Sequence, residues 1–258
     1  MIASKRNFLT RLTGAASAVA STICSPAIAR TLARRVSQSE LNEAIEAHAI
    51  WLEDRSRGVR AAFSNCDLSG LDFRNDQNTL VDLRGADLSE ADLSATTGHL
   101  VSFRRASLHY ARLSWSRLVE PAFIDASLRG AICENAVWGW DLRPSSGSKG
   151  AEPASSAVMF NCDAGKANFR RARIRGHFLD TNFVAASLAD ADLSRSTFTG
   201  SHLQETTFFR ADLTRARFDH AELAYVRFSQ ATLADADFTG ATFGPRVNLP
   251  DQQHHQIV

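Results

Sequence analysis

The chain has 258 residues, of which 44% are hydrophobic and 22% are charged, a composition typical of one globular domain or two small ones. Its formal net charge of +1 is too balanced for a nucleic-acid-binding protein or an acidic polyanion mimic. Four cysteines exclude a fold built mainly from disulfides, and no apolar run is long enough to span a bilayer. Sixteen phenylalanines against two tyrosines indicate a repeated position that favours an apolar aromatic side chain.

Residues 1–29 have the features of an export signal. A mildly apolar stretch follows three basic residues that have no acidic neighbours: Lys5, Arg6 and Arg11. The small-x-small pattern at 27–29 predicts cleavage between Ala29 and Arg30 and a periplasmic protein. The stretch SKRNFL at 4–9 resembles the twin-arginine export motif, with a lysine replacing the first arginine. A general secretory signal and a cytoplasmic protein with a basic N-terminus are the alternatives.

Residues 30–60 are interpreted as a linker followed by a capping helix. Ser37 and Glu40 form a capping-box pattern, and apolar residues then follow helical spacing. These signals predict a helix over residues 38–53. His48 lies on or beside its apolar stripe, where we expect it to pack rather than to bind a ligand.

From residue 61 the sequence repeats every five residues, in a first run over 61–140 and a second over 157–245. The third position of each quintet is nearly always Leu or Phe, the first is usually small, and the second is often Asp or Asn. A period of five would scatter the third positions around an α-helix and alternate them between the faces of a strand. The chain must therefore turn about once per quintet, with the third side chain on the axis of a solenoid.

The quintets carry a family resemblance. Several match the triplet Ala-Asp-Leu or its Phe and Asn variants: Ala86-Asp87-Leu88, Ala91-Asp92-Leu93, Ala191-Asp192-Leu193, Ala211-Asp212-Leu213, Ala167-Asn168-Phe169 and Ala236-Asp237-Phe238. The sequence resembles the pentapeptide-repeat family, whose consensus is A(D/N)LXX. The resemblance implies an all-β fold: a right-handed, quadrilateral parallel β-helix with twenty residues per coil. The helix at 38–53 would cover its N-terminal end.

The register also predicts where the solenoid is irregular. Two defective centres, Asn78 and Gly98, lie twenty residues apart and are expected to stack on one wall. Residues 141–156, rich in Pro, Gly and Ser, are expected to form an excursion loop, either neutral or used in recognition. A one-residue slip is expected at 177–180, and a flexible tail at 246–258.

Outward aromatic residues are the candidate protein contacts. We predict that four of them can anchor a partner: Tyr110, Trp115, Trp140 and Tyr225. Phe209 is also outward, and any of these rings could instead cover a neighbour. A basic run occupies successive outward sites: Arg170, Arg171, Arg173 and Arg175. Because Arg171, Asp190 and Arg210 should form an alternating column, mutual compensation is favoured over a phosphate-binding patch.

No catalytic, cofactor-binding or metal-binding constellation is recognisable in the sequence. Ser and Asp recur because the repeat places them, and neither a phosphate-cradling glycine loop nor a CxxC pair occurs. Beyond the signal segment, Cys66, Cys133 and Cys162 occupy inward positions and are expected to be buried. The sequence therefore predicts a protein that is not an enzyme and has no cofactor.

The leading functional hypothesis is an exported β-helical scaffold that mediates protein–protein interaction in the periplasm, without nucleic-acid binding or membrane insertion after processing. The alternative is a cytoplasmic, DNA-mimicking topoisomerase binder, as some relatives are; the outward arginines disfavour it. A less favoured hypothesis is a polysaccharide-binding or envelope-remodelling β-helix. The open final coil around Phe238 and Phe243 could also form a homodimer, which the resemblance supports.

Overall fold

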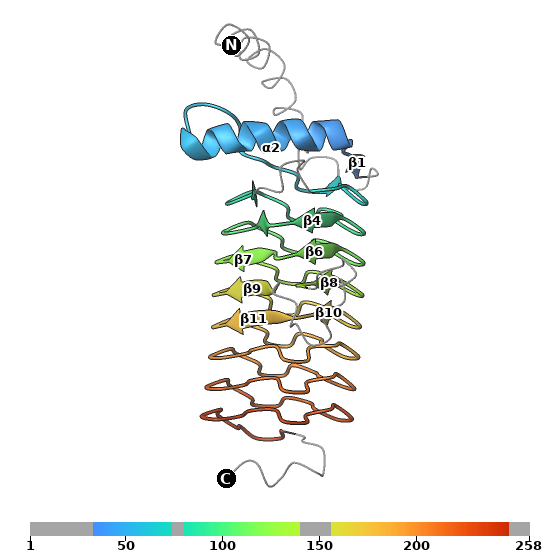
Figure 1. Cartoon of the computed structure of the whole chain (residues 1–258), viewed down its shortest axis with the longest axis vertical. Coiled ribbons are helices and arrows are strands. Elements are labelled where there is room, and N and C mark those ends of the chain that lie inside the picture. Colours follow the sequence, from blue (N-terminus) through green and yellow to red (C-terminus); the bar gives the residue numbers. More distant parts are fainter. Residues whose placement is uncertain (1–32, 74–79, 140–155, 248–258) are drawn as a thin grey trace, which may run out of the picture.

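The computed structural model describes residues 33–73, 80–139 and 156–247. The predicted signal peptide with its cleavage site at Ala29 and Arg30, the contact candidate Trp140, and most of the predicted loop and tail lie outside these residues. The described chain forms an elongated stack of coils with one helix lying across its N-terminal end (Figure 1). Within this part of the chain, no helix has the length and apolar composition needed to cross a membrane.

The strands are short and occupy successive walls of the coils. In chain order the elements are β1 (Arg34–Arg35), α2 (Gln38–Glu53), β2 (Cys66–Asp67), β3 (Val81–Asp82), β4 (Thr97–His99), β5 (Val101–Ser102), β6 (Arg117–Val119), β7 (Ala122–Ile124), β8 (Val137–Trp138), β9 (Ala157–Phe160), β10 (Arg173–Ile174) and β11 (Gly176–Leu179). They form three sheets with the orders β1-β2, β10-β8-β6-β4 and β11-β9-β7-β5-β3, and every pair is parallel. The predicted four-sided, parallel β-helix is confirmed.

Each quintet is a strand segment followed by a tight turn, as residues 91–95 illustrate. The side chains of Ala91 and Leu93 are buried, which explains the small first residue and the large apolar third residue. Asp92 accepts a hydrogen bond from the backbone N–H of Ser94 at 2.9 Å, so the second residue stabilises the turn. Ala95 has φ +57°, a left-handed conformation that directs the chain around the corner.

The interior explains the abundance of phenylalanine. Phe198, Phe218 and Phe238 stack along one wall, with centroid separations of 5.0 and 4.9 Å and planes within 6° of parallel. Phe208 and Phe228 form a second stack at 5.2 Å, and rings on the two walls meet edge to face. This interior has no place for a phenolic hydroxyl, so Phe is used instead of Tyr.

Helix α2 spans the residues predicted for it and covers the first coil. The Ser37 side chain accepts from the backbone of Glu40, and the Glu40 side chain accepts from the Ser37 backbone, which completes the capping box. Leu41 and His48 are the two residues of the helix that are fully buried. Before the helix, β1 pairs with β2 and extends one wall by a further strand, a feature that the sequence analysis missed.

The predicted stacking of Gly98 on Asn78 concerns a residue, Asn78, that lies outside the described residues. Asp72 pairs with Thr97, 25 residues later, so the first coil is longer than the predicted twenty residues. Gly98 lies between Phe73 and Leu118, where an added Cβ would approach the Phe73 Cβ to 3.4 Å and the Leu118 Cδ2 to 3.0 Å.

The shortened quintet is 172–175 and not 177–180. Arg173 and His177 are the second positions of successive quintets, because Arg173 pairs with Asp192 and His177 pairs with Thr197. The missing residue therefore lies between Arg173 and His177 and not after His177. Gly176 begins a complete quintet that places Phe178 in the core and ends with Asp180 at φ +49°.

Candidate functional site

One wall of the solenoid, here called face 1, gathers most of the exposed aromatic side chains. Face 1 is defined by its second-position residues, which successive parallel bridges join: Asp67, Asp92, Arg112, Ile132, Asn168, Ser187, Thr207 and Arg227. Tyr110 and Tyr225 are the corner residues that immediately precede quintets of this wall, and Trp115 is the corner residue that ends one. Phe209 lies on the wall itself. Face 1 is therefore bordered by aromatic rings along both edges.

The turn conformation explains why these rings point outward. Tyr110, Trp115 and Tyr225 have φ values of +56°, +64° and +60°, as corner residues do throughout the stack. The Tyr110 ring covers Gly130 of the next coil, where an added Cβ would come within 2.5 Å of the ring. A corner side chain cannot reach the core from this conformation, so a large ring placed there remains in solvent.

The exposed fractions of these side chains distinguish them from packed surface aromatics. Trp115 is 63% exposed, Tyr110 62%, Tyr225 46% and Phe209 38%. Three of the four predicted contact residues are thus exposed and adjoin face 1, and the fourth, Trp140, lies outside the described residues. Exposed aromatic rings of this size are typical anchors of protein interfaces.

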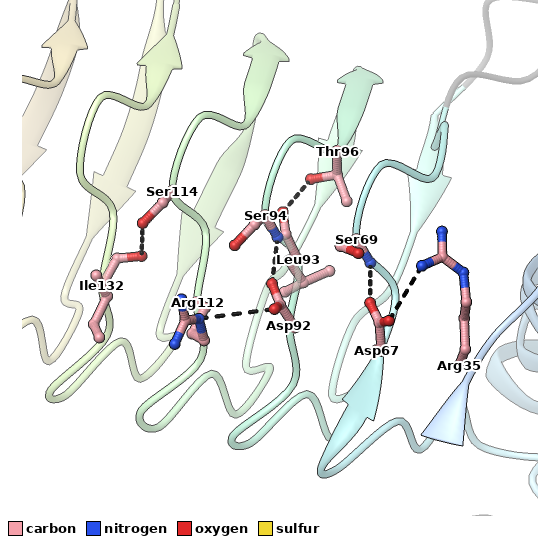
Figure 2. A network of polar contacts seen from close by, with 10 residues as sticks. All are labelled: Arg35, Asp67, Ser69, Asp92, Leu93, Ser94, Thr96, Arg112, Ser114 and Ile132. Carbon is pink, nitrogen blue, oxygen red and sulfur yellow. Dashed lines mark hydrogen bonds and ion pairs between the residues drawn. The ribbon is translucent and has the colours of Figure 1, made fainter. Parts of the chain in front are cut away.

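Ion pairs link the N-terminal coils of face 1 (Figure 2). Arg35 of β1 lies 3.4 Å from Asp67, and Arg112 lies 3.7 Å from Asp92 in the following coils. Hydrogen bonds from the Ser69 side chain and backbone N–H, with a further contribution from Arg35, lower the pKa of Asp67. Each of these two carboxylates is compensated locally by an arginine.

The basic run is compensated in the same way in the middle of the wall. Asp190 pairs with Arg170 at 3.1 Å and with Arg210 at 3.5 Å. The partner of Asp190 in the preceding coil is thus Arg170 and not Arg171, which the column had predicted. The expected mutual compensation of charges is nevertheless present, which argues against a phosphate-binding patch at this position.

A groove of about 620 Å³ opens at the C-terminal end of face 1, along the edge that carries Tyr225. Its lining combines small, polar, aromatic and charged residues: Ala185, Ala186, Ser187, Glu205, Thr207, Tyr225, Arg227 and Arg246. The sequence analysis identified Tyr225 but not the groove, because its two arginines come from different parts of the chain. Arg246 follows the last repeat and cannot be placed from the five-residue period.

The described residues offer little for nucleophilic or metal chemistry. Cys66, Cys133 and Cys162 are buried, in line with the sequence analysis, and none of them forms a disulfide within the described residues. Burial raises the pKa of the Cys133 thiol, and burial raises that of Cys162 to about 12, so both are protonated at neutral pH. Residues 33–73, 80–139 and 156–247 contain no cluster of three metal-ligating side chains.

A second apolar surface escaped the sequence analysis. Phe160, at the end of β9, is 41% exposed, and the outward side chains of Ile124, Val158 and Leu179 lie on the same sheet of β7, β9 and β11. Leu80 is also exposed, at 56%. The signal of Ile124, Val158, Phe160 and Leu179 is an apolar residue at the second or fourth position of a quintet, where the repeat normally carries a polar one. Leu80 is an apolar residue at the fifth position.

Comparison with known proteins supports the repeat assignment. The family model for pentapeptide repeats matches residues 82–118, 177–215 and 211–244, with eight copies. No curated protein matches the sequence.

Three solved structures of limited similarity were also matched. A trypsin-treated form of QnrB1, a plasmid-mediated fluoroquinolone resistance protein, is 18% identical, with a TM-score of 0.46, over 76% of this chain and 87% of that one. Rfr23 from the cyanobacterium Cyanothece 51142 is 15% identical, with a TM-score of 0.31, over 48% and 91%. HetL from Nostoc sp. strain PCC 7120, a protein involved in heterocyst differentiation regulation, is 27% identical, with a TM-score of 0.24, over 72% and 86%.

Proposed function

We propose that the chain, whose residues 82–118, 177–215 and 211–244 match the family model for pentapeptide repeats, is an exported, non-enzymatic scaffold that binds a protein partner in the periplasm through face 1. The observation that carries the proposal is the position of the exposed aromatic residues. Tyr110, Trp115, Phe209 and Tyr225 lie on or beside one wall, and each is at least 38% exposed.

The repeat architecture suits such a role. Each coil is held by backbone hydrogen bonds to the next, as between the Leu93 N–H and the Arg112 carbonyl at 2.7 Å. Side chains at corners are therefore presented from a regular backbone, and little conformational entropy is lost when a partner binds them. Aromatic anchors on a pre-organised surface are a common basis for protein recognition.

Charge distribution favours this function over DNA mimicry. A mimic of DNA needs a continuous acidic surface, but acidic residues of the coils pair with arginines of the same or neighbouring coils. Examples on three walls are Asp92 with Arg112, Asp235 with Arg215, and Asp125 with Arg105. These pairs neutralise the field that a nucleic-acid-binding enzyme would recognise.

The periplasmic location rests on the N-terminal sequence. The basic segment with Lys5 and Arg6 and the cleavage pattern that ends at Ala29 are the features that support it. Fractionation of cells that produce the wild type or the variant Lys5→Gln/Arg6→Gln tests this part of the proposal. The wild type should enter the periplasm and lose the segment, and the variant should accumulate in the cytoplasm. Cytoplasmic wild type would contradict export.

The contact surface is tested by pull-down from envelope extracts. The variant Tyr110→Ala/Trp115→Ala removes two anchors, and Phe160→Ala is a matched control because this ring is exposed on another wall. The double variant should lose the proteins that the wild type captures, and the control should retain them. Equal loss in both variants, or retention in both, would rule out face 1 as the binding surface.

The final coil supports an additional proposal, a homodimer in which two C-terminal ends stack. Phe238 is the last tightly packed ring of the interior, and Phe243 contacts it at 5.8 Å between centroids while remaining only partly buried. A second copy would extend the apolar column and remove both rings from water.

A further inference from the structure

We propose that the groove at the C-terminal end of face 1 binds an extended acidic peptide segment, with carboxylates against Arg227 and Arg246 and an apolar side chain against Tyr225. The proposal rests on the proposed function for the origin of this peptide, which would belong to the protein partner. It adds the chemical class that the partner must present.

The groove exists because small residues in one coil lie beside larger ones in the next two. Ala185 and Ser187 line it in one coil, and Glu205 and Thr207 line it in the next coil. One coil further along the stack, the corner residue Tyr225 lines the groove. The N–H of Tyr225 donates to the carbonyl of Pro245 at 3.0 Å, which fixes the chain after the last repeat beside this ring. Arg246 is thereby brought to the groove.

The charge of the groove is unbalanced, unlike that of the coils above it. Among residues 33–73, 80–139 and 156–247, no carboxylate forms an ion pair with Arg227 or Arg246. Both side chains are exposed and both line the groove. Two guanidinium groups against the single carboxylate of Glu205 leave a net positive charge, and guanidinium groups bind carboxylates through paired hydrogen bonds.

The other lining residues favour a peptide over a small anion. A volume of about 620 Å³ falls in the range of sites that enclose a sizeable ligand, and inorganic phosphate would leave most of it empty. The Tyr225 ring, 46% exposed, offers an apolar surface beside the arginines. An extended peptide can place a carboxylate and an apolar side chain close together, and can thus contact both features.

Glu205 makes one end of the groove negative, so that the two ends differ in charge. It makes no ion pair with a basic residue of the described chain, and it lines the groove one coil away from Tyr225. A second carboxylate at that end of the peptide would be repelled, whereas a lysine or an amide would be accepted. Removing this negative charge should strengthen binding of a uniformly acidic peptide, a gain that a folding defect cannot produce.

Fluorescence anisotropy with defined probes tests the proposal at low salt, where surface electrostatics are strongest. The probe is an end-blocked peptide of alternating glutamate and phenylalanine, and the neutral reference replaces glutamate by glutamine. The protein carries Arg227→Gln/Arg246→Gln, Glu205→Gln, or the charge-matched control Arg117→Gln/Arg171→Gln, whose arginines do not line the groove.

The acidic probe should bind the wild type at least about tenfold more tightly than the neutral reference. The groove variant should lose about tenfold in affinity, Glu205→Gln should gain about threefold, and the control should change less than twofold. Equal losses in the groove variant and the control, or no binding below about 1 mM, would overturn the proposal. Displacement of the probe by inorganic phosphate at a lower concentration, or tighter binding of oligogalacturonate, would assign the groove to a free anion or a polysaccharide instead.

The result can be separated from that of the pull-down. If the envelope partner is captured equally by the wild type and by Arg227→Gln/Arg246→Gln, the groove proposal fails while the scaffold function stands. If the acidic probe binds as expected but no partner is captured, the reverse holds.

Discussion

The imidazole of His48 accepts a hydrogen bond from the backbone N–H of Ala61, with 3.1 Å between Nδ1 and the amide nitrogen. The other ring nitrogen, Nε2, lies 3.2 Å from the carbonyl oxygen of Arg84. Nδ1 can accept only when it carries no proton, so the neutral ring with hydrogen on Nε2 satisfies both contacts. One buried side chain thus joins helix α2 to the first residue of the repeats and to the next coil.

This contact predicts that acid weakens the stack at its N-terminal end. Burial lowers the pKa of His48 from its ordinary value of 6.5, although the Arg84 carbonyl and Asp82 oppose the shift, and Arg60 and Arg84 add to it. The unfolded chain therefore binds a proton at a higher pH than the folded chain. The free energy of unfolding should fall as the pH decreases from about 6.5 to the folded-state pKa, and level off below it.

The pH effect is measured as the melting temperature of the wild type and of His48→Gln between neutral and mildly acidic pH. Carboxylates titrate in both proteins, so the difference between the two curves isolates the imidazole. The variant should be less stable at neutral pH and should lose the step that begins near the ordinary histidine pKa. Parallel curves would show that His48 does not titrate in this range.

The phenylalanine stack predicts a strong difference between interior and exterior rings. Phe218 is fully buried between Phe198 and Phe238, so Phe218→Ala should lower the free energy of unfolding by about 3–5 kcal/mol through lost burial and a residual cavity. The matched control Phe209→Ala removes an exposed ring and should cost less than about 1 kcal/mol. Urea denaturation measures both, and similar costs would contradict an interior role for Phe218.

The corner conformation predicts a cost that depends on the backbone alone. Gly70 has φ +73°, and an added Cβ would meet no atom within 4 Å, so Gly70→Ala should destabilise by about 1 kcal/mol through the left-handed conformation. Gly130 has a similar φ of +68°, but its added Cβ would strike the Tyr110 ring. Gly130→Ala should therefore also move Tyr110, and NMR of that ring should distinguish the two variants.

The general fold could be predicted from the sequence because the repeat is encoded locally. A small first residue, a polar second residue and an apolar third residue determine which side of the wall each side chain faces, and the same solution recurs in every coil. Irregularities depend on how coils meet. The pairing of Asp72 with Thr97 and of β1 with β2 joins segments 25 or more residues apart, and no local pattern encodes either.

The candidate site also has features that the sequence predicts and features that it does not. Outward positions of Tyr110, Trp115 and Tyr225 follow from their place in the quintet, so their exposure was predictable. Their common position beside face 1 was not, because it depends on the exact number of residues in each coil. Arg246 shows the limit most clearly: it reaches the groove only because the N–H of Tyr225 holds the Pro245 carbonyl.

The proposed homodimer makes the last prediction. Phe243→Glu places a charge at the open end of the apolar column, beside Phe238, and desolvating that charge in a dimer interface would be costly. Light scattering during gel filtration should give a dimer for the wild type and a monomer for Phe243→Glu. Phe160→Glu is the matched control, because it adds the same charge to an exposed ring far from this end, and it should remain dimeric. A wild-type monomer at micromolar concentration would exclude the homodimer. A dimer that survives Phe243→Glu but not Phe160→Glu would place the dimer interface at another surface.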